Sequence, residues 1–261
     1  MPSIKKQVNL LQMQTDTLNI NALPALNYSV TEALNTLWTN ISYSGSNVKV
    51  IAFTSCHSDE GKSFMVMRLA RIILSCGKRV LVIDADLRKS VLAGRYRIRS
   101  LNGDIWGLAH YLTGQCPPEQ IIYETNIPSL SMILAGHVVL DSFSLLDSPL
   151  LPLLVNKVRD RYDVILIDTP PVGVLIDAAI IARYCDGTVL VVKEDEVTRR
   201  ELVEARGQIE KIGGKVLGVV LNDVVFSFQG IKKYYYKSYQ RYDVSQYGYY
   251  GSGDDGKNTS R

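Results

Sequence analysis

The sequence predicts a doubly wound α/β fold with a mostly parallel sheet and helices on both faces. Short apolar runs rich in β-branched residues alternate with stretches of helical periodicity, which is typical of chains that build a parallel sheet. Most runs are apolar at both alternating sets of positions, so their strands are expected to be buried on both faces. The predicted strands span residues 48–54, 80–84, 130–134, 164–168, 188–192 and 216–221.

The first predicted element follows an N-terminal arm. Residues 1–28 show no sustained apolar period and are rich in Asn, Gln and Thr, so we expect them to be flexible. Ser29 and Glu32 have the spacing of a capping box, and the apolar residues after them recur with helical periodicity. These features predict a helix from Ser29 to about Tyr43.

A second helix is predicted directly after the first strand. Residues 63–76 have apolar residues along their whole length, are followed by Gly77, and are long enough for a right-handed crossover. Residues 91–127 are less regular. We expect one folded domain over residues 29–225 and a separate tail over residues 226–261.

Composition excludes several classes of protein. The chain has 261 residues and a net charge of +3, too small to argue for nucleic acid binding by itself. The longest uncharged stretch, residues 125–140, is too short to span a bilayer, and the N-terminus lacks the apolar segment of a secretory signal. These features predict a cytoplasmic protein. No CxxC pair or Cys/His cluster suggests a structural metal, so the cysteines are expected to be reduced.

The most specific motif is Glu60-Gly61-Lys62-Ser63, which lies between a predicted strand and a predicted helix. Backbone N–H groups at such a turn converge on one point and form an anion site that fits a triphosphate. Lys62 is expected to neutralise the β and γ phosphates, and the Ser63 hydroxyl to ligate magnesium. Cys56 replaces the usual first glycine of the loop, and Asp59 replaces another, although Asp tolerates a left-handed backbone.

Acidic residues follow two of the predicted strands. Asp84 and Asp86 end one strand, and Asp168 ends another. The carboxyl ends of parallel strands are where α/β sheets bind ligands, so we expect these acids beside the phosphate loop. One carboxylate would serve Mg²⁺ and another would orient the nucleophile or accept its proton.

The composition changes sharply after Asn222. The tail carries eight tyrosines, interleaved with basic residues, and has no aliphatic periodicity with which to form a core. A segment of this kind suits autophosphorylation. The expected acceptors are Tyr234, Tyr235, Tyr236, Tyr239, Tyr242, Tyr247, Tyr249 and Tyr250.

With these motifs taken together, the chain resembles the bacterial tyrosine kinases (BY-kinases) of capsule and exopolysaccharide synthesis, which are P-loop NTPases. The resemblance covers about residues 29–250 and includes the phosphate loop, residues 80–88, residues 164–171 and the tyrosine-rich tail. It implies an ATP- and Mg²⁺-dependent protein-tyrosine kinase that regulates polysaccharide synthesis.

The resemblance also implies roles for single residues. Lys62, Asp84 and Asp86 would be catalytic, with Asp84 as the base toward a tyrosine hydroxyl. Ser63, Asp86 and Asp168 would serve the metal, and Asn222 would read adenine. The expected nucleotide-binding residues are Ser58, Asp59, Glu60, Gly61, Lys62, Ser63, Phe64 and Asn222.

Partners follow from the same resemblance. Family members of this length act with a membrane adaptor of the polysaccharide co-polymerase type, which would bring the kinase to the inner face of the membrane, and with a cognate tyrosine phosphatase. The family's homo-oligomer depends on a Glu-x-x-Arg-x-x-Arg helix pattern, of which Glu32 is kept here but Asn35 and Trp38 replace the arginines. A homo-oligomer would then need an apolar contact of Trp38 in place of the ion pairs, or would be absent.

Two other readings remain open on the sequence. A ParA/MinD-like positioning ATPase would share the fold, the phosphate loop and the strand-end acids. That class typically carries a signature lysine early in the loop, where residues 56–59 have none, and it has no need of clustered tyrosines. The other reading is a non-enzymatic module whose basic and aromatic tail binds nucleic acid or anionic lipid.

Overall fold

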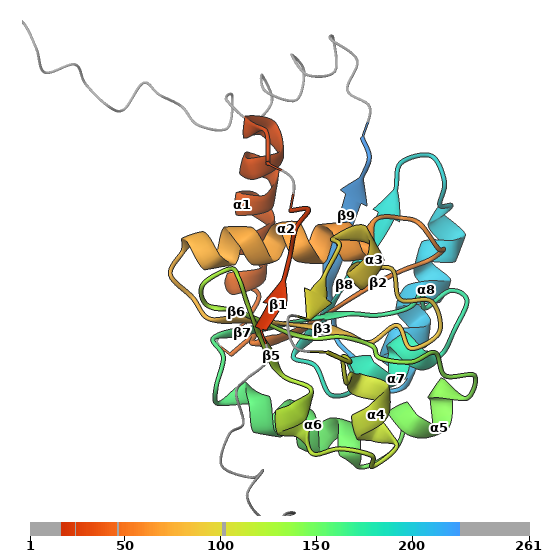
Figure 1. Cartoon of the computed structure of the whole chain (residues 1–261). Helices are drawn as coiled ribbons and strands as arrows, with labels where there is room; N and C mark the ends of the chain where they lie inside the picture. The colour runs from red at the N-terminus through yellow and green to blue at the C-terminus, as the bar shows by residue number, and fades with distance from the viewer. Residues whose placement is uncertain (1–16, 24, 46, 101–102, 225–261) are drawn as a thin grey trace, which may run out of the picture. The chain divides into compact units, whose positions relative to one another are not determined.

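The computed structural model describes residues 17–23, 25–45, 47–100 and 103–224. Within them, one nine-stranded sheet lies between helices (Figure 1). The strands are β1 (Thr17–Asn19), β2 (Val50–Ser55), β3 (Val80–Asp84), β4 (Arg99–Ser100), β5 (Tyr123–Thr125), β6 (Leu130–Ile133), β7 (Val164–Asp168), β8 (Gly187–Lys193) and β9 (Val216–Asn222). The helices are α1 (Tyr28–Ser42), α2 (Lys62–Ser75), α3 (Leu92–Arg95), α4 (Leu108–Leu112), α5 (Ser142–Leu146), α6 (Leu150–Arg159), α7 (Asp177–Ala182) and α8 (Arg199–Lys211), with a 3₁₀ turn at Pro118–Gln120.

The six predicted strands form the parallel part of the sheet. Across the sheet the strand order is β4-β1-β5-β6-β3-β7-β2-β8-β9, and the six strands from β6 to β9 in this order are all parallel to one another. The predicted doubly wound α/β class is confirmed. Antiparallel pairing occurs between β5 and β6 and between β1 and β4.

Helices cover both faces because the strands are apolar on both. In β3, Val80 and Val82 join a core cluster with residues of α1 and α2, whereas Leu81 and Ile83 join a cluster with residues of α4 and α6. A fully buried aliphatic side chain contributes about 1.5–3 kcal/mol. Five consecutive buried residues therefore make β3 a strongly held central strand.

The N-terminal part of the chain differs from the prediction. Residues 1–28 were expected to form a flexible arm, but β1 pairs with β4 and β5 inside the sheet and buries Leu18 completely. The cap of α1 also differs. Asn27, not Ser29, is the N-cap, and its side-chain oxygen accepts a hydrogen bond from the Val30 amide at 2.9 Å. Residues 1–16 lie outside the described residues.

The C-terminal end of the domain lies close to the expected boundary. The compact unit extends to Asp223, and the tail predicted from residue 226 lies outside the described residues. No helix in the described part of the chain is long and apolar enough to cross a membrane.

The strand order brings the predicted acids to one edge of the sheet. β7 lies between β3 and β2, with Asp84 of β3 and Phe53 of β2 both in register with Asp168. The phosphate loop follows β2, so it begins at the same edge. The fold thus gathers motifs that are about 100 residues apart in sequence.

Candidate active site

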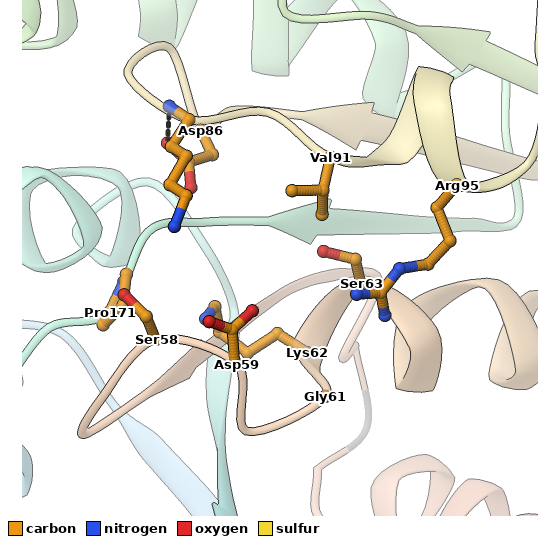
Figure 2. A pocket seen from close by; sticks show the side chains of 10 residues that line it. Ser58, Asp59, Gly61, Lys62, Ser63, Asp86, Val91, Arg95 and Pro171 are labelled. Atoms are coloured by element: carbon orange, nitrogen blue, oxygen red, sulfur yellow. Dashed lines mark hydrogen bonds between the residues drawn. The ribbon is translucent and has the colours of Figure 1, made fainter.

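The phosphate loop, residues 57–63, connects β2 to the first turn of α2. Asp59 and Gly61 have φ angles of 63° and 90°, so the loop takes the left-handed backbone at both positions. The tolerance expected of Asp59 is confirmed, since Asn and Asp adopt this region more readily than other side chains. The turn directs the N-terminus of α2 toward the pocket in Figure 2, where the helix dipole favours an anion.

Ten residues line this pocket, and six of them belong to the predicted site. Figure 2 shows Asp59 and Lys62 on one side, Asp86 on the other, and Arg95 entering from α3. The lining residues are Ser58, Asp59, Gly61, Lys62, Ser63, Asp86, Lys89, Val91, Arg95 and Pro171.

Lys62 is held in place at the base of the loop. Its Nζ donates to the Ser55 hydroxyl at 2.9 Å, and the Ser55 hydroxyl donates to the His57 carbonyl. Burial lowers the pKa of Lys62, although Asp168 and Asp86 act in the opposite direction. A buried ammonium beside several carboxylates is pre-positioned for a phosphate group.

Glu60 has a structural contact that the sequence did not reveal. Its carboxylate is fully buried, and it accepts from the backbone amides of His57 at 2.6 Å and Lys193 at 3.3 Å. The side chain therefore ties the phosphate loop to the end of β8 and does not line the pocket. The prediction that Glu60 binds nucleotide can apply to its backbone only.

Asn222 and Phe64 contact residues close to the pocket but do not line it. The Asn222 amide nitrogen donates to the Glu60 carbonyl at 3.0 Å, and it would lie 2.1 Å from a Cβ at Gly61. Only glycine fits there. The Phe64 ring packs on the Arg68 guanidinium, 3.3 Å from the ring centroid. Neither side chain lines the pocket, so adenine recognition by Asn222 stays a prediction.

Asp84 and Asp168 form a buried acidic pair. Burial raises the pKa of both carboxyls, and the charge of Asp168 raises that of Asp84 further. Asp84 accepts from the Ser90 hydroxyl at 2.5 Å and from the Asp86 amide at 3.3 Å. The Ser63 hydroxyl bonds to Asp168. Asp168 Oδ1 is buried without a hydrogen-bond partner among the described residues.

These oxygen atoms fit a magnesium site. A hard cation prefers carboxylate, hydroxyl, phosphate and water oxygens, and an unpartnered buried carboxylate oxygen is costly without one. In the described part of the chain, no three His, Cys, Asp or Glu side chains gather closely enough to hold a metal by themselves. A cation held by Ser63, Asp86 or Asp168 would therefore take its remaining ligands from phosphate and water.

Asp86 is the strand-end acid that lines the pocket, together with Asp59 of the phosphate loop. Its Oδ1 accepts from the amides of Arg88 at 3.2 Å and Lys89 at 2.8 Å, which closes a tight turn after β3. The geometry brings Asp86 to the pocket wall with Lys62 and Ser63, as predicted, whereas Asp84 lies behind the wall.

Sequence reasoning missed two basic residues. Lys89 and Arg95 line the pocket. Both lie within nine residues of Asp86, so their closeness in sequence to a strand-end acid could have identified them as pocket residues. Their charges offset those of Asp59 and Asp86, so the pocket can accept a polyphosphate.

A phosphate loop at the carboxyl edge of a parallel sheet, with three acids ending neighbouring strands, defines a P-loop nucleotide-binding protein of the α/β class. Residues 48–205 match the model of the AAA domain family. The chain is 39% identical over 193 residues to the tyrosine-protein kinase CpsD of Streptococcus agalactiae, which covers 74% of this chain and 83% of that protein.

Solved structures agree with this relationship. The kinase domain of the Escherichia coli tyrosine kinase ETK superposes with a TM-score of 0.69 at 25% identity, over 77% of this chain and 79% of that one. The septum site-determining protein MinD of Pyrococcus horikoshii, solved with Mg-ADP, has a TM-score of 0.56 at 21% identity, over 71% of this chain and 76% of that one, so the likeness is one of fold. The chain belongs to the bacterial tyrosine-protein kinases.

Proposed function

We propose that this chain transfers the γ-phosphoryl group of Mg²⁺-bound ATP to tyrosine hydroxyls and thereby regulates capsular or exopolysaccharide synthesis. The observation that carries the proposal is the convergence of Lys62, Ser63 and Asp86 on one pocket, backed by the buried pair of Asp84 and Asp168. Relatives named tyrosine-protein kinase support the acceptor class.

The chain's own residues would bind and orient the nucleotide. The N-terminus of α2 and the Lys62 ammonium hold the phosphates, and Arg95 and Lys89 add positive charge at the pocket wall. Bound magnesium would neutralise charge that develops on the transferred phosphoryl group. The Ser63 hydroxyl and the carboxylates of Asp86 and Asp168 are its proposed ligands.

Asp84 is the proposed base toward the tyrosine hydroxyl. Its raised pKa is the property that a general base working near neutral pH needs. The carboxylate is buried, but Ser90 is exposed and donates to it. The Ser90 hydroxyl therefore connects Asp84 to the surface on which an acceptor would arrive.

The proposed acceptors include the tail tyrosines, Tyr234 to Tyr250, which lie outside the described residues. Residues 226–261 hold six basic and three acidic residues, against 29 and 26 in the whole chain, so the positive net charge resides in the tail. Each phosphate adds about −1.5 to −2 charges, so phosphorylation would reverse the sign of the tail.

A membrane adaptor of the polysaccharide co-polymerase type is the proposed activator, and a tyrosine phosphatase the proposed antagonist. An adaptor would place the kinase at the inner face of the membrane. A homo-oligomer would need contacts other than arginine pairs. Asn35 donates to Glu32 within α1, and the half-buried Trp38 packs partly against the protein's own core, which leaves only its exposed part for a partner.

A positioning ATPase is the main alternative, since the fold is shared. The phosphate loop has no early lysine, and the clustered tyrosines have no function in that class. Sequence identity to named tyrosine kinases over most of the chain favours phosphoryl transfer to tyrosine.

The test is to separate nucleotide binding from transfer. Lys62→Ala removes a charge-assisted contact and is expected to weaken ATP binding about 10- to 100-fold, read by calorimetry. Asp84→Asn is expected to keep binding but to lower transfer about 10²- to 10⁴-fold, read by phosphotyrosine mass spectrometry. Exposed Lys211→Ala serves as control. Parental transfer by Lys62→Ala would contradict the proposal.

A further inference from the structure

Arg88 has no part in the phosphate chemistry described above, yet its side chain is firmly held. Its Nε donates to Asp177 Oδ2 at 3.1 Å, and its Nη1 donates to the Leu140 carbonyl at 3.1 Å. Asp177 is the first residue of α7, and Leu140 lies just before α5. One guanidinium thus joins three segments that are distant in sequence.

Asp177 is the buried end of this contact. Its side chain is 1% exposed, and the Ser142 hydroxyl donates to the same oxygen that Arg88 contacts. Its other oxygen, Oδ1, has no hydrogen-bond partner among the described residues. A buried carboxylate is costly unless a cation faces it, so Arg88 is required to compensate the charge of Asp177. The pair is therefore expected to be rigid.

The Arg88–Asp177 pair restrains the turn that carries Asp86. The amides of Arg88 and Lys89 donate to Asp86 Oδ1, so the backbone at these two residues sets the direction of the carboxylate. Leu87 is fixed as well, because its carbonyl accepts from the Val139 amide at 2.9 Å. In Figure 2 the Asp86 side chain lies across the pocket from Lys62.

We propose that Asp177, acting through Arg88, is a positioning residue that holds Asp86 in the orientation needed for the metal. The inference rests on the proposed function, because Asp86 is a proposed metal ligand. It assigns a role to residues that touch neither phosphate nor metal. Loss of a group that orients a metal ligand without touching the metal typically weakens metal affinity about 10- to 100-fold.

A second Arg–Asp pair provides a matched control. Arg159 contacts Asp186 through two hydrogen bonds of 2.8 and 3.1 Å, and Asp186 also accepts from the amides of Lys49 and Val50. Asp186 directly precedes β8 and its amide donates to Val50, the first residue of β2, so the pair lies at the sheet edge opposite the phosphate loop. Its loss is expected to affect stability alone.

The experiment compares Asp177→Asn with Asp186→Asn in the full chain. The first readout is hydrogen exchange of the amides of residues 86–90 without metal or nucleotide. Asp177→Asn is expected to speed exchange there and Asp186→Asn is not. The second readout is the Mg²⁺ concentration that half-saturates binding of a fluorescent ATP analogue. Asp177→Asn should raise it about 10-fold or more, with Asp186→Asn unchanged.

Two further variants keep the test informative. Arg88→Gln should reproduce both effects, and the double variant Arg88→Gln/Asp177→Asn should be no worse than the worse single one, because the two residues act as a unit. If Asp177→Asn does not fold, Ser142→Ala removes one donor to Asp177 and should produce the same changes to a smaller degree.

The outcomes distinguish this inference from the proposed function. Parental exchange at residues 86–90 together with a parental Mg²⁺ requirement in Asp177→Asn overturns the positioning role, whatever happens to the melting temperature. Equal changes in Asp177→Asn and Asp186→Asn also overturn it, since they would reflect general destabilisation. A parent protein that binds nucleotide without any need for Mg²⁺ contradicts the proposed function instead.

Discussion

The carboxyls of Asp84 and Asp168 lie in register at the ends of β3 and β7, and the fold removes both from water. Burial raises the pKa of both carboxyls above the usual 3.8, and the charge of Asp168 raises that of Asp84 further. In the folded state both groups hold protons that the unfolded chain releases. The stability from this pair is therefore complete below pH 3.8 and is lost as the pH rises through the raised pKa values.

Because these pKa values are raised, the stability of the fold is expected to depend on pH. In chelator and without nucleotide, the free energy of unfolding should fall between about pH 4 and pH 8, and Asp168→Asn should remove part of that fall. Urea unfolding at several pH values measures it. Mg²⁺ with ATP should restore stability at the upper end, because a bound cation compensates the carboxylates. Parallel profiles for the parent and Asp168→Asn would show that the pair does not cause the dependence.

Individual site residues differ in how far the sequence could predict them. Lys62, Ser63 and Asp86 were predicted because motif spacing fixes their place relative to a strand and a helix. The side-chain contact of Glu60 was not, because its partner Lys193 lies 133 residues away. Arg95 was missed for a different reason: it follows Asp86 by only nine residues, but it reaches the pocket only because the turn after Asp86 returns α3 toward it.

At the scale of elements, a substitution in β1 can show whether the β4-β1-β5 side of the sheet contributes to stability. Leu18→Ala removes a side chain that is 0% exposed, and a cost of about 2–5 kcal/mol is expected from the cavity left behind. Leu153→Ala, on the exposed side of α6, is the matched control and should change stability by no more than about 0.5 kcal/mol. Denaturant unfolding of both variants measures the difference.

A cost below 1 kcal/mol for Leu18→Ala, or one equal to that of Leu153→Ala, would contradict a stabilising role for β1. The sequence did not predict β1, because Thr17–Asn19 contains one apolar residue and is too short to show an alternation of apolar and polar residues. β4 and β5 are as short, and their pairing depends on distant partners. Five of the six parallel strands, β2, β3, β6, β7 and β8, are buried along almost their whole length, and burial on both faces requires continuous apolar runs. β9 has the same apolar pattern, although several of its residues are exposed.

The sequence alone could not identify which residue caps the N-terminus of α1. Asn27, Ser29 and Glu32 all belong to residue types that cap helices, and local sequence does not rank them. The helix begins at Tyr28, so Asn27 holds the cap position and its side chain accepts from the Val30 amide. The predicted capping box was wrong by two residues, although the helix itself was predicted correctly.

At the scale of the whole molecule, the positively charged tail suggests how copies of the chain would act on one another. The tail holds eight tyrosines over 17 residues and so presents many equivalent hydroxyls. A segment of this length could reach the active site of another copy of the chain. We therefore predict that tail phosphorylation proceeds in trans.

The experiment mixes two chains that are each unable to label themselves on the tail. One carries Lys62→Met with an intact tail, and the other is active but ends after Asn222. The Lys62→Met chain should acquire phosphotyrosine between Tyr234 and Tyr250, as read by mass spectrometry. The initial rate should rise with concentration, because the step is bimolecular unless the chains are already assembled. A tail variant with all eight tyrosines changed to Phe controls for labelling elsewhere. If the Lys62→Met chain stays unlabelled while the parent labels itself at high dilution, transfer occurs within one chain.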